Sequence, residues 1–81
     1  MAEIKPGDML AKIGRTLYGA RWRLPLATAL GTHEGQLRRW EQRPGDLQHD
    51  DPLFAAASEL LRQHAQECEA MRATLERWRH R

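Results

Sequence analysis

The stretch that decides the fold is Arg23–Gln42, RLPLATALGTHEGQLRRWEQ, in which a helical pattern of apolar residues stops at Gly31 and then resumes. A corner between two short helices needs a residue that adopts a positive φ at little steric cost, and glycine does so most easily. Pro25 is tolerated only in the first turn of a helix, so the first helix should begin near Leu24. The pattern therefore predicts two short helices that meet at a sharp angle at Gly31.

The second of these helices is expected over about residues 34–42, with Thr32 or His33 at its N-cap. Small or apolar side chains are expected between the two helices: Leu26, Ala27, Leu30, Leu37 and Trp40. A larger residue at Gly31 would be expected to crowd Ala27. This is a helix-turn-helix arrangement, in which the first helix braces the second and the second presents its outer face to the DNA major groove.

The rest of the chain is also expected to be helical. Leu10, Ile13 and Leu17 repeat at helical spacing before Gly19, which predicts a helix over about 7–18. No segment alternates polar and apolar residues for long enough to form a strand. We therefore expect an all-α fold of one small domain. Its first part is a helix-turn-helix body of three short helices in residues 1–50.

A long C-terminal helix is expected in residues 51–81. Asp51 is placed to cap this helix, Pro52 occupies its first position, and neither glycine nor proline follows. Before it, the sequence Arg43-Pro44-Gly45 ends the preceding helix, and the polar stretch to Asp50 is expected to be a loop.

The segment Arg23–Gln42 resembles the twenty-residue helix-turn-helix of phage-repressor and Cro-like (XRE-like) proteins. The matching apolar, small and turn positions are Leu26, Ala27, Leu30, Gly31, Leu37 and Trp40. The sequences LRRWE and LYGARW are also similar to those of small bacterial and phage members, and the resemblance covers about residues 8–45. Thr32 departs from it, because the family usually has an apolar residue there, followed by a Ser or Thr cap. Either the turn is shifted by one residue or His33 is a weaker cap.

The resemblance implies a sequence-specific regulator of transcription that binds double-stranded DNA, a homodimeric repressor of bacterial or phage type. Residues 12–43 contain seven basic and two acidic residues, a balance of +5 in a chain of net charge +2. Residues on the outer face near the start of the recognition helix are candidates for base reading: Glu34, Gly35, Gln36 and Arg39. Four further arginines are candidates for phosphate contacts: Arg21, Arg23, Arg38 and Arg43.

The C-terminal segment carries an apolar stripe at alternating spacings of three and four residues. Its members are Phe54, Ala57, Leu61, His64, Cys68, Met71, Leu75 and Trp78. The early part, with Leu53 and Leu60, can cover the body, whereas the later part extends beyond it. We therefore expect a homodimer whose interface contains His64, Cys68, Met71, Leu75 and Trp78. The pattern leaves the orientation of the two helices open.

Other classes of function have weaker signals. His64 and Cys68 stand four residues apart, but two ligands from one helix favour a polar pair that marks the register over a metal site. No catalytic triad, phosphate-binding loop or cofactor motif is present in the sequence, so we expect neither an enzyme nor a cofactor. The alternative function is a helical protein-protein interaction module, an adaptor of the antitoxin or phage-accessory kind.

The expected environment is the cytoplasm. The single cysteine and the charged start MAEIKPGDM argue against a secreted protein, and no apolar stretch approaches the ~18 residues of a membrane span. The expected partners are therefore double-stranded DNA and a second copy of the chain, with another protein as the partner in the alternative function, and no membrane.

Overall fold

The computed structural model describes residues 4–81, and this part of the chain contains helices and no strands. The predicted all-α fold is confirmed. Residues 1–3, at the start of the charged N-terminal stretch, lie outside the described residues. The elements are α1 (Pro6–Tyr18), η1 (Gly19–Arg21), α2 (Arg23–Leu30), α3 (Glu34–Gln42), η2 (Pro44–Asp46) and α4 (Pro52–Arg79).

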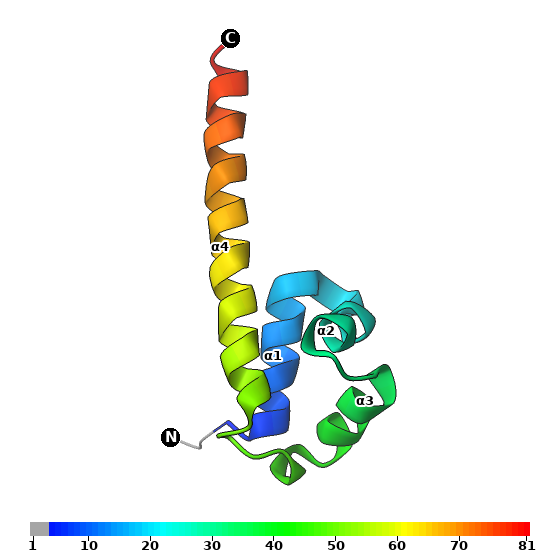
Figure 1. Cartoon of the computed structure of the whole chain (residues 1–81). Coiled ribbons are helices and arrows are strands. Elements are labelled where there is room, and N and C mark those ends of the chain that lie inside the picture. Colours follow the sequence, from blue (N-terminus) through cyan, green and yellow to red (C-terminus); the bar gives the residue numbers. More distant parts are fainter. Residues whose placement is uncertain (1–3) are drawn as a thin grey trace.

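The three short helices form a body beside the first half of α4, as Figure 1 shows. Helix α1 lies along α4, and α3 lies on the opposite side of α1. Helix α4 has 28 residues, which extend about 42 Å at ~1.5 Å per residue. Its second half projects beyond the body, and the whole molecule is 52 Å long.

The core is a cluster of apolar side chains gathered from all four α-helices and their connections. Its buried members are Leu10, Ala11, Trp22, Leu26, Ala27, Leu37, Leu47 and Ala57. Trp22 is 2% exposed and lies against Gly14 of α1, where an added Cβ would be 2.2 Å from the ring atom Cε3. Trp22 thus fills the junction of α1 and α2. Trp40 packs against the same cluster but is only partly buried.

The segment after α3 is more ordered in its packing than the predicted loop. It contains the short helix η2, and Leu47 is 3% exposed in the core. Gly7 of α1 approaches this segment closely, since a Cβ there would lie 2.3 Å from the Trp40 carbonyl oxygen and 2.6 Å from Pro44 Cα. The start of α1 therefore packs directly against the backbone at the end of α3 and the start of η2.

The turn between α2 and α3 has the predicted conformation. Gly31 has a φ of +73°, and the Thr32 N–H donates to the Ala27 carbonyl at 2.9 Å. The side chain of His33 accepts a hydrogen bond at Nδ1 from the Gln36 N–H at 3.2 Å. His33 is therefore the N-cap of α3. The expected crowding of Ala27 is wrong, because a Cβ at Gly31 would meet no atom within 4 Å.

The start of α4 also follows the sequence pattern. The Asp51 carboxylate accepts a hydrogen bond from the Leu53 N–H at 2.9 Å, and Pro52 is the first helical residue. Leu53, Phe54 and Leu60 pack against the core cluster. The first half of α4 is therefore part of the body's core, as predicted.

Substitution of Gly31 should destabilise the fold through its backbone conformation alone. Gly31→Ala should lower the free energy of unfolding by about 1–2 kcal/mol, because an L residue is disfavoured in the left-handed region. Gly31→Val should cost more, since a β-branched side chain resists positive φ. Gly45→Ala is the matched control, because Gly45 also has no atom within 4 Å of an added Cβ but has no positive φ. Denaturant unfolding would contradict this account if both alanine variants were equally stable.

Candidate nucleic-acid interface

Helix α3 presents one face to the body and the other to solvent. Leu37 is buried, and Trp40 is turned toward the core cluster. The exposed residues of the helix are Gly35, Arg38, Arg39 and Gln42. The outer face of the predicted recognition helix is therefore accessible along its whole length and carries two arginines.

The predicted base-reading residues do not all point outward. Gly35 and Arg39 are exposed, and the Arg39 Nη1 donates to Gln36 Oε1 at 3.3 Å. Glu34 is half-buried, and its carboxylate accepts from Arg38 Nη2 at 2.9 Å. Gln36 and Arg39 therefore form one polar unit, whereas Glu34 is paired within the helix.

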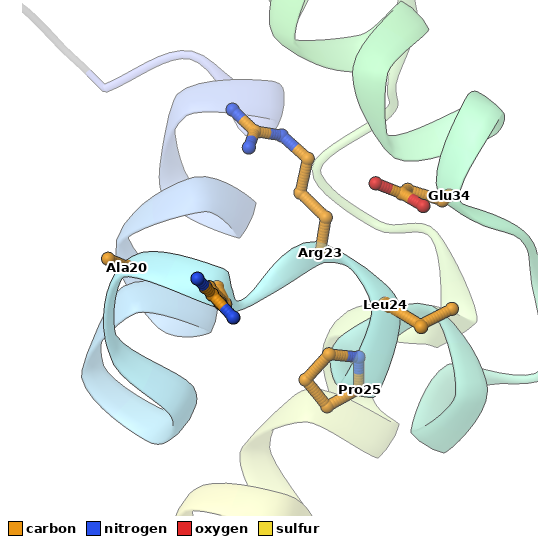
Figure 2. A pocket seen from close by; sticks show the side chains of 6 residues that line it. Ala20, Arg23, Leu24, Pro25 and Glu34 are labelled. Atoms are coloured by element: carbon orange, nitrogen blue, oxygen red, sulfur yellow. The ribbon is translucent and has the colours of Figure 1, made fainter.

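A hollow of about 430 Å³ separates the start of α2 from the start of α3. Figure 2 shows Glu34 on α3 pointing across it toward Arg23 on α2. Its lining residues are Ala20, Arg21, Arg23, Leu24, Pro25 and Glu34. A second hollow of the same volume lies beside it, lined by Arg23, Arg38, Glu41 and Gln42. Arg23 thus stands between two open depressions on the face shared by α2 and α3.

Arg23 is held by a bidentate ion pair with Glu41. Arg23 Nε lies 2.6 Å from Glu41 Oε2, and Arg23 Nη2 lies 2.9 Å from Glu41 Oε1. The hydrogen bond to Glu41 raises the pKa of Arg23 above its usual value, so the guanidinium stays charged. This pair ties the first residue of α2 to the last turn of α3. Arg23 therefore has a partner within the body, which its predicted role as a phosphate contact did not include.

The other three predicted phosphate contacts differ in their surroundings. Arg38 is paired with Glu34, as described above. Arg21 and Arg43 are exposed, and within residues 4–81 no acidic side chain lies within ion-pair distance of either. Arg21 and Arg43 are therefore the two members of the set whose charge is free to meet a phosphate. They flank the helix-turn-helix, one before α2 and one after α3.

Among the predicted dimer residues, His64 lines a hollow together with Leu17 and Tyr18 of α1, and the others lie farther along α4. Met71 is 63% exposed, Leu75 46% and Trp78 65%. Cys68 is exposed, and its Sγ lies 3.6 Å from Nε2 of the half-buried His64. In the part of the chain that the structure describes, no three His, Cys, Asp or Glu side chains gather as a metal would require. The later part of the apolar stripe, from Cys68 to Trp78, therefore faces solvent in the single chain.

Residues 4–81 include no helix that is both long enough and apolar enough to cross a membrane. Comparison of the chain with protein-family models, curated proteins and solved structures gives no match. The chain combines an accessible, arginine-bearing helix packed on the core with exposed apolar side chains along the second half of α4.

Glu41 is a residue of this surface that the sequence pattern did not predict. It stands 18 residues from Arg23, a separation at which no local rule predicts a pair. A weak signal was available, because Glu41 lies one residue after the inward-facing Trp40 and could be expected near α2. Its carboxylate joins the last turn of α3 to the first residue of α2.

The Arg23–Glu41 pair should couple the two residues in stability measurements. Arg23→Met and Glu41→Met should each lower the melting temperature, because each leaves a half-buried charge without its partner. The double variant should lose less melting temperature than the two single losses added together. Additive losses in a double-mutant cycle would show that the ion pair does not connect the helices.

Proposed function

We propose that this chain is a sequence-specific regulator of transcription that binds double-stranded DNA as a homodimer, a repressor of bacterial or phage type. The observation that supports this most directly is the turn at Gly31, which leaves the outer face of α3 exposed while its inner face packs in the core. A major groove about 12 Å wide admits such a helix. The second support is the basic character of the segment that contains it.

Base reading in this proposal centres on Gln36 and Arg39. Arginine can donate two hydrogen bonds to guanine O6 and N7, and glutamine can pair with adenine. The hydrogen bond between these two side chains orders both before DNA arrives. Gly35 has no side chain on the exposed face, so the backbone of α3 can approach the base edges closely. Glu34 would first have to leave Arg38 before it could accept from cytosine.

Phosphate contacts in this proposal come mainly from Arg21 and Arg43. Their charges have no acidic partner within the described residues, and they lie on either side of the reading helix. Two exposed cations in these places can fix the protein on the DNA backbone without selecting a sequence. Arg23 contributes mainly by joining α2 to α3 through Glu41, and Arg38 is paired with Glu34 within α3.

Selection of bound sequences from random duplexes, followed by titration at two salt concentrations, tests the proposal. A regulator should enrich one sequence and should lose affinity steeply as salt rises, because bound counterions are released from the DNA. Failure to enrich any sequence would overturn it. The helical interaction module would then become the leading function, since the apolar stripe of α4 could also bind another protein.

Removal of the Arg39 side chain and removal of the Arg21 side chain should change DNA binding in different ways. Arg39→Ala should weaken binding to the selected site by about 1–3 kcal/mol and relax the preference at one base pair. Arg21→Ala should weaken binding to all sequences similarly and reduce the salt slope by about one. Competition titrations with single-base variants of the site give both quantities. An unchanged preference for Arg39→Ala would remove α3 as the reading helix.

The homodimer follows from the second half of α4, where apolar side chains at heptad spacing are exposed. Solvent-exposed apolar stripes of this kind are normally covered by a partner helix. A second copy presents the same stripe at the same spacing. Two copies also match the two half-sites that helix-turn-helix repressors bind.

Two acidic substitutions in the stripe should separate the copies. Met71→Glu with Leu75→Glu would place desolvated like charges in the interface, and the dimer should lose several kcal/mol of stability. The control is Gln66→Glu with Ala70→Glu, which adds the same two charges to exposed positions away from the stripe. Sedimentation should give a monomer for the first variant and a dimer for the control. A parent protein that sediments as a monomer at tens of micromolar would contradict the homodimer.

A further inference from the structure

The exposed stripe of α4 faces the same direction as the buried side of its first half. Ala57 and Leu75 are 18 residues apart, which is about five full turns of an α-helix at ~3.6 residues per turn. Their side chains therefore leave the helix at nearly the same angle. Ala57 is 0% exposed, whereas Leu75 is 46% exposed. This face of α4 is therefore covered near Ala57 and exposed to solvent near Leu75.

The chain's own body covers this face along the first half of α4. Helix α4 contacts α1 and α2, and Leu53 and Leu60 pack against the core cluster. Figure 1 shows α1 beside the first half of α4 and no other helix beside the second half. A helix that docks on the stripe at Leu75 therefore lies directly above the body, in line with α1.

This arrangement excludes a parallel, in-register helix pair. In such a pair, the first half of the second copy's α4 would run where the body of the first copy stands. The two helices would have to diverge to avoid this overlap, which would leave most of the stripe exposed. A parallel pair would bring Glu67 near Arg72 of the other copy, but an exposed ion pair contributes little to stability. It cannot compensate for the overlap of two packed chains.

We propose that two copies pair through antiparallel α4 helices over residues 61–78, with the two-fold axis between Glu69 and Ala70. This inference rests on the homodimer in the proposed function and specifies its geometry. Each contact of the pair then occurs twice: Leu61 with Trp78, His64 with Leu75, and Cys68 with Met71. Heptad positions in antiparallel helix pairs meet in this way when the apolar seams face each other.

The flanking charges are compatible with this register. Glu67 faces Thr74 of the second copy and Arg72 faces Ala65, so no like charges meet beside the seam. The C-terminal end of the second copy reaches a hollow of about 280 Å³ at the upper edge of the body. The hollow is lined by Leu17, Tyr18 and Leu60 together with the polar side chains of Gln63, His64 and Glu67. Trp78 of the second copy, 65% exposed in the single chain, is the aromatic side chain placed to fill it.

The antiparallel pair also sets the positions of the two bodies. They lie at opposite ends of the paired helices, with the two copies of Ala57 about 38 Å apart along the axis at ~1.5 Å per residue. A parallel pair would put both bodies at the same end. The dimer is therefore elongated, and each body projects its helix-turn-helix away from the helix pair.

Disulfide trapping in the full chain tests the orientation. With Cys68→Ala as the background, His64→Cys and Leu75→Cys are made separately, and the two variants are also co-expressed with tags of different size. Facing positions in one layer bring the Cβ atoms within the reach of a disulfide. Oxidation should crosslink the co-expressed pair and leave each variant alone uncrosslinked. Thermal melting and sedimentation of each variant establish that it is folded and associated.

The other results are distinguishable and would overturn the inference. Crosslinking of each variant with itself would show a parallel pair, and the homodimer would stand. If the protein sediments as a dimer but neither the single variants nor the co-expressed pair crosslinks, residues 64 and 75 do not face each other. That result contradicts the register. Folded variants and parent that all sediment as monomers would remove the homodimer itself, while leaving DNA binding to its own test.

Discussion

The position of α3 depends on the contact between the Trp22 ring and the backbone of α1 at Gly14. The ring is 2% exposed, and a side chain at residue 14 would overlap it. Trp22 directly precedes α2, so the packing of its ring against Gly14 determines where α2 begins and how α2 is oriented relative to α1. Arg23, the next residue, then reaches Glu41 on α3. The Trp22 ring therefore connects α2 to α1, and the neighbouring Arg23 connects α2 to α3.

The same segment shows how the protein distributes its positive charge. The stretch from residue 12 to residue 43 contains only two glutamates, and each is paired with an arginine on the α2–α3 face. The Arg23–Glu41 pair joins α2 to α3, the Arg38–Glu34 pair lies within α3, and together they neutralise four of the nine charges. The remaining charges are all positive, and those of Arg21 and Arg43 flank the α2–α3 unit. A field of one sign around this unit would attract a phosphate backbone at long range, more strongly at low salt.

Local rules predicted the helices well because their signals lie within a few residues. Gly31, Asp51 and Pro52 each act on the turn in which they stand, and the structure places all three as expected. The burial of Leu47 and the Arg23–Glu41 pair could not be read in this way, because both depend on segments that meet only after the chain folds. The predicted crowding at Gly31 failed for a related reason. The direction of a missing Cβ depends on φ, and at +73° it points into open space.

The second half of α4 poses a physical problem that the body cannot solve. A single helix of this length without tertiary packing is marginal in water, since most helical stability in proteins comes from a packed face. The Arg72 guanidinium lowers the pKa of Glu69 below its usual value, so this pair stabilises the helix above the ordinary carboxylate pKa and ceases to as the pH falls through the lowered one.

Such an exposed pair adds little, and the apolar stripe beside it remains wet. In the proposed homodimer a second copy would cover the stripe and order the helix in one step, so helix stability should rise with protein concentration. If both bodies of that dimer also bind one DNA molecule, linkage requires that DNA strengthen the dimer by the same factor by which dimerisation strengthens DNA binding.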